Sequence, residues 1–125
     1  MICDNNALTS LNVSSNTSLA LLSCWNNPIT SLNVNGCTVL GTLWAGSNSL
    51  SSLDVSTNTA LISLDCNNNA LGQASVDGIL ASLVTNAQVS GSVDLSGGTN
   101  ATASAAGLLS KAILETSSSW TVTVN

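Results

Sequence analysis

Two aspartates come closest, by type and spacing, to residues that could do catalytic chemistry. Asp65 and Asp94 hold the same position in two alternating segments, Leu64-Asp65-Cys66 and Val93-Asp94-Leu95, which we expect to pair as parallel strands about 4.8 Å apart. A carboxylate pair at that separation suits a retaining glycosidase or a bound cation such as calcium. On an open sheet the pair lacks the pocket and the apolar neighbour that would raise one pKa. We therefore expect two solvated like charges, no catalytic residue and no enzyme.

Tryptophan provides a second signal, because aromatic anchors dominate protein interfaces. The chain has three Trp and neither Tyr nor Phe. Residues that flank an inward strand position point outward, which places Trp25 and Trp44 on one exposed face, on adjacent strands and about 8 Å apart. Gly46 beside Trp25 leaves room for its ring. The rings either anchor a partner or lie flat over the sheet. The candidate partner-binding residues are Trp25, Trp44, Asp65, Asn67 and Asp94.

The four cysteines are expected to be structural. Cys3, Cys24 and Cys66 share an inward position, where a small buried thiol packs like a hydrophobic residue. A Cys3–Cys24 disulfide would have to leave ideal geometry, because side chains stacked in register point parallel to each other. The chain has no His and no C-x-x-C spacing, so no metal site and no cofactor are expected. Cys37 lies at a corner, where we expect it to be accessible.

Composition excludes several classes of function. Only 6% of the 125 residues are charged, the net charge is −5, and Lys111 is the one basic side chain. Nucleic acid is therefore not an expected partner, because phosphates are neutralised by several Lys or Arg. No apolar run approaches the roughly 18 residues of a membrane span, so no membrane partner is expected. Ser, Thr and Asn supply 51 residues, which leaves contact rather than acid–base chemistry as the expected use of the surface.

A 21-residue internal repeat organises the first part of the chain. It has the form L-x-x-L-x-C-x-x-N-x-L-x-x-L-x-V-x-x-N-T-x, and it contains two short alternating stretches separated by Asn-rich corners. Neither stretch can bury its apolar face alone, but stacked copies form a continuous core. The positions that keep the 21-residue step include Leu8, Ile29, Leu50 and Leu71; Val13, Val34, Val55 and Val76; and Asn6, Asn27, Asn48 and Asn69. The recurring Asn is expected to bond the backbone of the next coil.

The segment L-x-x-L-x-C-x-x-N-x-L resembles the strand of leucine-rich repeats. Leu61-Ile-Ser-Leu-Asp-Cys-Asn-Asn-Asn-Ala-Leu71 is similar to the bacterial 21-residue variety, broadly internalin-like, and the resemblance covers residues 1 to about 76. It implies an α/β solenoid with strand-only coils at the N-terminal end. The later strands align at Leu64, Val93 and Val122, which are 29 residues apart. This step is similar to that of the strand-plus-helix repeats of the ribonuclease-inhibitor type.

The remaining chain is expected to form two helix-backed coils. Ser75 is expected to cap a helix through residue 86, and Ser104 a second helix that buries Leu108, Leu109, Ala112 and Ile113. Trp120 shares the inward parity of Val122 and should fill the core. We thus predict one domain, 1–125, with 21-residue repeats in 1–74 and two 29-residue repeats in 75–125 that act as a C-terminal cap. One parallel sheet of six rungs is centred near residues 2, 23, 44, 65, 94 and 123.

The first coil carries no capping segment in this sequence. Met1 stands in the register of Leu22, so Leu8, Leu11 and Val13 are expected to face an open end of the core. Either the chain is a fragment of a longer repeat protein, or a partner or second copy covers this end. Two functions follow as hypotheses. The first is a non-enzymatic module that binds a protein or glycan through its sheet face. The alternative is a structural subunit of a phage virion, extracellular filament or surface layer, which would place it outside the cell or on its surface.

Overall fold

The computed structural model describes all residues 1–125 and is an α/β arrangement of parallel strands and two helices. The central residue of each three-residue strand is a leucine, which faces the core side of the strand. The elements are β1 (Ser10–Asn12), β2 (Leu21–Ser23), β3 (Ser31–Asn33), β4 (Thr42–Trp44), β5 (Ser63–Asp65), α1 (Gln73–Asn86), β6 (Gly91–Asp94), α2 (Ala105–Ser117) and β7 (Trp120–Thr123). Neither helix is long and apolar enough to cross a membrane.

Five parallel strands form the larger sheet, in the order β2-β4-β5-β6-β7. Leu22 pairs with Leu43, and Leu43 with Leu64, which is the shorter step of the sequence repeat. Leu64 then pairs with Val93, and Val93 with Val122, which is the longer step. The register inferred from the repeat is therefore confirmed. The expected first rung is reduced to an isolated bridge between Ile2 and Ser23, so the sheet has five strands rather than six rungs.

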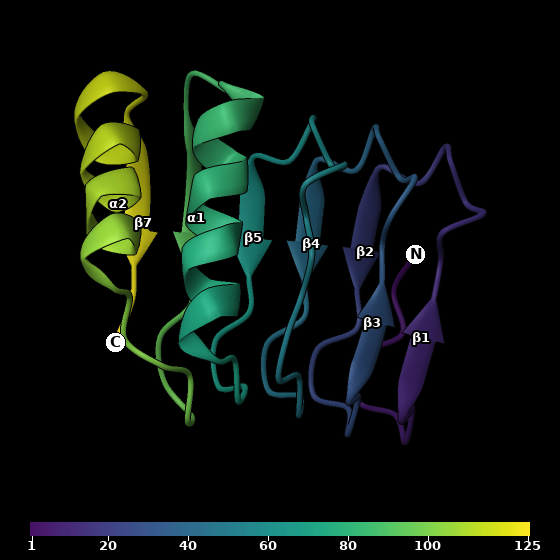
Figure 1. Cartoon of the computed structure of the whole chain (residues 1–125). Helices are drawn as coiled ribbons and strands as arrows, with labels where there is room; N and C mark the ends of the chain where they lie inside the picture. The colour runs from purple at the N-terminus through teal and green to yellow at the C-terminus, as the bar shows by residue number, and fades with distance from the viewer.

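A second sheet, β1-β3, was not expected as a separate unit. Ser10, Leu11 and Asn12 pair in parallel with residues 31–33. Figure 1 shows this small sheet, followed by α1 and α2, as a layer across from the five-stranded sheet, with the two chain termini at opposite ends of the stack. The third copy of this stretch forms no strand. The amide of Leu53 donates instead to the hydroxyl of Ser75 at 3.0 Å, so its backbone bonds a side chain of α1.

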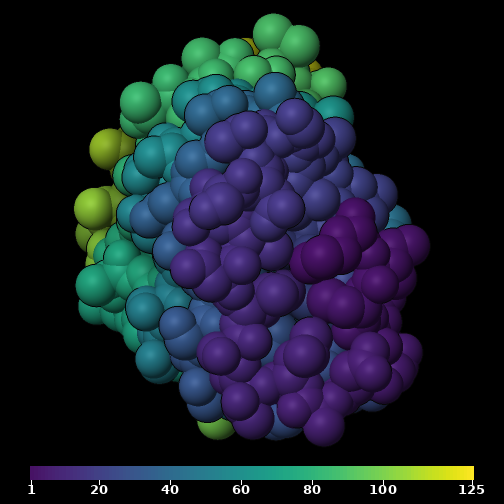
Figure 2. All heavy atoms as spheres, turned by 90° about the vertical axis from the view of Figure 1, so that its right-hand side faces the viewer, coloured from purple at the N-terminus to yellow at the C-terminus, as the bar shows by residue number.

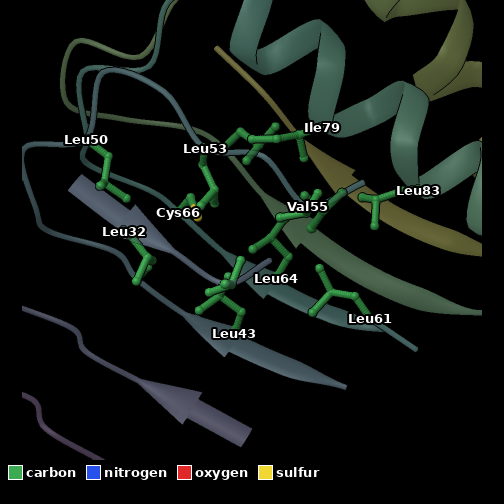
Figure 3. Packing of buried hydrophobic residues seen from close by; sticks show 14 of the residues in the cluster. Leu32, Leu43, Leu50, Leu53, Val55, Leu61, Leu64, Cys66, Ile79 and Leu83 are labelled. Atoms are coloured by element: carbon green, nitrogen blue, oxygen red, sulfur yellow. The ribbon is translucent and has the colours of Figure 1, made fainter. Parts of the chain in front are cut away.

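The core lies between these two layers. Figure 3 shows leucines and valines from both layers meeting with Cys66, and with Ile79 and Leu83 of α1. The stacked leucines Leu43, Leu50 and Leu61 are completely buried. Because each coil brings the same apolar positions to the same depth, the repeat builds one continuous core. Trp120 is 4% exposed within it, which confirms its inward position.

A ladder of Asn side chains joins neighbouring coils at one corner. The Oδ1 atom of Asn48 accepts the amide of Ile29 at 3.1 Å, and its Nδ2 donates to the carbonyl oxygen of Cys24 at 3.1 Å. Asn69 repeats this pattern one coil further on, where its Oδ1 accepts the amide of Leu50 at 2.9 Å. The expected Asn ladder between coils is therefore present, although each Asn bonds the backbone of the preceding coil rather than that of the next one. It satisfies backbone groups that the stacking of coils would otherwise leave buried without a partner.

Just before the recurring Asn of each strand-only coil, one residue adopts a left-handed backbone. These residues are Asn5 (φ 55°), Asn26 (φ 55°), Ser47 (φ 52°) and Asn68 (φ 50°). Asn tolerates this conformation better than most residues that carry a side chain. The backbone geometry thus explains why the corners are rich in Asn.

The first helix begins earlier than its expected cap. Gly72 occupies the N-cap position of α1 without a side-chain hydrogen bond, and the Ser75 hydroxyl instead contacts Leu53. The predicted start at Ser75 is therefore wrong, because a tertiary partner competes for that hydroxyl. One face of the helix packs into the core. Val76, Ile79, Leu80 and Leu83 are all buried, while Val84 is half-buried.

The second helix presents the opposite face to the one expected. Ser104 caps α2 as predicted, since its Oγ accepts the amides of Ala106 and Gly107. The buried residues of α2 are Gly107 and Leu114. The prediction that its main apolar stripe is buried is wrong. That stripe is exposed, with Leu108 50% exposed, Leu109 64% and Ile113 38%, and Ala112 is also exposed.

The cause of this reversal lies between the helices. A Cβ atom at Gly107 would stand 2.1 Å from Oδ1 of Asp77, so α2 approaches α1 closely at its glycine. The same Asp77 oxygen accepts the amide of Ser104 at 2.9 Å. These two contacts fix the rotation of α2. Leu108 and Leu109 are left exposed by this rotation.

The other end of the stack is formed by the first coil, whose residues cover most of the view in Figure 2. Leu8 and Leu11 are half-buried there, and Met1 is 47% exposed. Val13 is only 2% exposed, so the expectation that it faces an open end is wrong. Its backbone is held from the neighbouring coil, because its amide donates to Asn33 and its carbonyl oxygen accepts the Cys37 thiol.

Candidate functional site

The outward face of the five-stranded sheet carries the residues singled out from the sequence. In the sheet register, Trp44 on β4 is the partner of Asp65 on β5, which is in turn the partner of Asp94 on β6. Trp25 follows β2 on the neighbouring strand. The two indole side chains are 40% and 44% exposed. The structure therefore brings Trp25, Trp44, Asp65 and Asp94 onto one face, as their spacing predicts.

Side chains from three residues of this face lie close to Gly46. A Cβ atom at Gly46 would lie 2.9 Å from Nε1 of Trp25, 3.0 Å from Oδ1 of Asp65 and 2.7 Å from Oδ1 of Asn67. Gly46 itself is buried. The expectation that a glycine here leaves room for the Trp25 ring is thus confirmed. The missing side chain also lets a carboxylate and an amide oxygen approach the indole from the next strand.

The two carboxylates are held in fixed orientations by local turns. Oδ1 of Asp65 accepts the amide of Asn67 at 2.9 Å. Oδ1 of Asp94 accepts the amide of Ser96 at 2.9 Å and its hydroxyl at 2.6 Å. The second oxygen, Oδ2, of each carboxylate accepts no hydrogen bond from the protein. Each acid therefore keeps one carboxylate oxygen that no protein donor uses.

The charge of Asp65 is disfavoured where it stands. Partial burial raises the pKa of this carboxyl, the Asn67 amide lowers it, and the negative charge of Asp94 raises it again, with a net shift upward. The sequence-based expectation was of a pair too exposed for any carboxyl pKa to be raised. The upward shift of the Asp65 pKa differs from this expectation, because Asp65 is half-buried between its neighbours rather than freely solvated.

The indole of Trp44 is tied to the sheet by one contact. Its Nε1 donates to the hydroxyl of Ser63 on β5 at 3.3 Å. The ring therefore lies across the neighbouring strand on the same face that carries Asp65. Both hypotheses for the tryptophans agree with this position, since a ring lying over the sheet can still present its free face.

Asp4 is a third carboxylate of this face, and sequence reasoning did not select it as a site residue. Its Oδ1 accepts the amide of Trp25 at 2.8 Å and the hydroxyl of Ser23 at 2.6 Å. The 21-residue step from Asp4 to Trp25 was the signal that could have found it. Ser23 is only 2% exposed, with its hydroxyl bonded to this carboxylate.

The cysteines do not contribute to the site. Cys24 and Cys66 are buried and Cys3 is half-buried, and all four thiols are free. Burial raises the pKa of Cys24 to about 12, with smaller contributions from Cys3 and Asp4. The expected accessible position of Cys37 is wrong. It is completely buried and donates to the carbonyl oxygen of Val13 at 3.2 Å.

The burial of Cys37 has a clear structural reason. One coil further on, the equivalent Asn58 is also buried, and it donates to the carbonyl oxygens of Val34 and Cys37. The thiol of Cys37 takes the same inward role toward its own preceding coil. No group of three or more Cys, Asp or Glu side chains stands close enough to hold a metal ion.

The site face is open rather than hollowed. The four surface hollows of the molecule are lined by residues within 15–19, 30–35, 52–56 and 74–86. None of these includes Trp25, Trp44, Asp65, Asn67 or Asp94. The arrangement therefore offers exposed rings and acceptors to a surface or an extended ligand, and it has no cavity that would enclose a small substrate.

Comparison with known proteins adds no relative. No family model matches the chain, and no curated protein or solved structure matches it either. The interpretation of this face therefore rests on its own geometry and charges.

Proposed function

We propose that the chain is a leucine-rich-repeat solenoid of the bacterial 21-residue type. The parallel register supports this, because it follows the shorter step from Leu22 to Leu64 and the longer step from Leu64 to Val122. The Asn ladder between coils supports it as well. In this proposal residues 1–74 form the strand-only repeats. Residues 75–125 form two helix-backed repeats that close the C-terminal end of one domain.

We further propose that this solenoid is a non-enzymatic interaction module. It binds a protein or a glycan through the exposed face that carries Trp25, Trp44, Asp65, Asn67 and Asp94. The observation that supports this most directly is the exposure of both indoles, 40% and 44%, on adjacent strands of one face. Folding does not require large rings at outward positions, whereas binding sites are enriched in Trp.

Binding is favoured over catalysis by the chemistry of the same residues. The chain has no His, and the Asp65–Asp94 pair lies on an open sheet rather than in a hollow that excludes water. A general acid in a glycosidase is held in a pocket that keeps it protonated and encloses the sugar. The acids are therefore assigned to ligand contact and not to proton transfer.

Arrays of glycans and of peptides, probed with the labelled chain, test this function. We expect binding to some members that is lost when Trp25→Ala and Trp44→Ala are combined. The matched control is Val89→Ala, which removes an apolar side chain that is 81% exposed in the loop between α1 and β6. Circular dichroism checks that both variants fold. Unchanged binding by the double variant would contradict the proposal.

Assembly through the ends of the stack is the second candidate function. The exposed stripe Leu108, Leu109 and Ile113 on α2 favours it, together with the half-buried Leu8 and Leu11 at the other end. In a head-to-tail contact these two surfaces would meet, which propagates as a filament unless it is blocked. Light scattering over a concentration series tests this. A monomer at all concentrations up to about 1 mM, or an assembly unaffected by Leu109→Glu, would contradict assembly through this contact.

A further inference from the structure

The sheet face combines aromatic surface with negative charge that nothing balances. Asp4, Asp65 and Asp94 all lie on or beside it. The single basic side chain, Lys111, lies on α2 and pairs with Glu115. The only other positive group, the terminal amine, bonds the carbonyl oxygen of Leu21, on a strand that β4 separates from Asp65. The face is thus complementary to a positively charged ligand.

The geometry defines where a cation would be held. Asp65 lies near both tryptophans: it pairs in register with Trp44, and its Oδ1 and the Nε1 of Trp25 approach the same point above Gly46. The free Oδ2 atoms of Asp65 and Asp94 are on adjacent strands. A planar cation could therefore lie against an indole and donate to both carboxylates.

We propose, as a refinement that rests on the proposed binding function, that this face binds an arginine side chain presented by a partner protein. The guanidinium stacks against the indoles of Trp25 and Trp44 and donates to the free oxygens of Asp65 and Asp94. Arginine fits better than lysine, because its planar fork matches carboxylates and its flat surface packs on aromatic rings.

Other ligands fit the same atoms less well. A neutral glycan could stack on an indole, but it would leave two adjacent carboxylates uncompensated. Calcium takes six to eight oxygen ligands, and here the two carboxylates already commit one oxygen each to local turns. A guanidinium needs only the two free oxygens and the ring surface, and both are present.

Nuclear magnetic resonance of the three indole N–H groups provides the test. The probe is the peptide acetyl-Gly-Arg-Gly-Arg-Gly-amide, with the citrulline peptide of the same shape and no charge as its control. We expect the Trp25 and Trp44 signals to shift saturably with the arginine peptide. Trp120, which is buried and donates to the carbonyl oxygen of Gln88, is the internal reference and should not move.

Matched variants separate local contact from net charge. Asp65→Asn with Asp94→Asn keeps the turn acceptors but removes both charges, and we expect it to weaken binding about tenfold or more. Asp54→Asn with Asp77→Asn removes the same total charge elsewhere, where Oδ1 of each residue likewise accepts a backbone amide. This control should retain binding within about twofold.

Several outcomes would overturn the arginine proposal. These are equal binding of the citrulline peptide, unchanged affinity in the Asp65/Asp94 variant, and no indole shift with the arginine peptide. Stronger shifts with calcium chloride or chitohexaose would also overturn it. The last result would leave the proposed binding face in place, because the same two indoles would still respond. The array experiment with the Trp25/Trp44 variant decides separately whether the face binds at all.

Discussion

Replacement of the buried ladder residue Asn69 by Ala should remove a large part of the stability of the chain. Asn69 is 3% exposed. Its Oδ1 is the only acceptor for the amide of Leu50, at 2.9 Å, and its Nδ2 donates to the carbonyl oxygens of Ala45, Cys66 and Asn67. Alanine can neither accept from Leu50 nor bridge the two coils.

The size of the loss in stability depends on which backbone groups keep a hydrogen-bond partner in Asn69→Ala. The carbonyl oxygen of Ala45 still accepts from Asn48, and that of Cys66 still accepts from Asn100. Only the buried N–H of Leu50 is left unpaired, which costs about 1–3 kcal/mol. The lost bonds of the Asn69 amide group add roughly 1 kcal/mol. We therefore expect the free energy of unfolding to fall by roughly 2–4 kcal/mol.

Urea unfolding followed by circular dichroism measures this change, with hydrogen exchange of the Leu50 amide as a local readout. Asn6→Ala is the matched control. Asn6 has the same position in the first coil, but it is exposed and its side chain donates only to Cys3 and Asp4 of its own coil. It should cost no more than about 0.5 kcal/mol. A loss below about 1 kcal/mol at Asn69, or equal losses at both positions, would refute the reasoning.

Three further predictions concern a corner, a charge and a thiol. Gly98→Ala should lower the free energy of unfolding by about 1–3 kcal/mol, because φ is +58° and the new Cβ would lie 2.6 Å from a backbone oxygen of the preceding coil. Gly46→Ala, where the close atoms are side-chain ends, should cost less in the same urea titration. Asp94→Asn should lower the raised pKa of Asp65 toward its ordinary value in a carbon-13 carboxyl titration, although burial, the larger cause, remains. Since a raised native pKa means that the folded state binds more protons than the unfolded state, the contribution of Asp65 to wild-type stability should fall as pH rises from the ordinary carboxyl pKa through the raised one. Asp94→Asn should narrow the pH range between the ordinary and the raised pKa of Asp65. An unchanged titration of Asp65 in this variant would contradict the prediction. Finally, the thiol of Cys24, with a pKa of about 12, should react with a disulfide reagent at pH 8 only after unfolding in urea, so rapid reaction in the native state would show that it is not buried.

The internal repeat predicts those parts of the fold that depend on equivalent positions. Leu22, Leu43 and Leu64 align because each coil needs the same apolar residue at the same depth, and the sequence displays that requirement three times. The ladder Asn is predictable for the same reason. Its side chain bonds backbone groups that every coil leaves unpaired, so the same residue recurs at the same position of each repeat.

Features that occur once were harder to predict. The helical period shows that α2 has an apolar stripe, but it does not show that Gly107 is the residue that approaches α1, which turns Leu109 away from the core. Likewise Ser75 has the type and position of a helix cap, yet Leu53 of the preceding coil takes its hydroxyl. In both cases a contact between coils outweighs a local preference.

The candidate site lies at the positions that the repeat leaves unconstrained. Along one outward row of the sheet, the residues are Ser23, Trp44, Asp65, Asp94 and Thr123, whereas the adjacent inward row is Leu or Val throughout. Packing explains the inward row completely, and it gives no reason for an exposed indole or for two adjacent like charges in the outward one. Each of these outward choices lowers stability or solubility by itself. A ligand that covers the indoles and neutralises the carboxylates would remove both disadvantages together, and this is the physical reason why we propose binding as the use of this face.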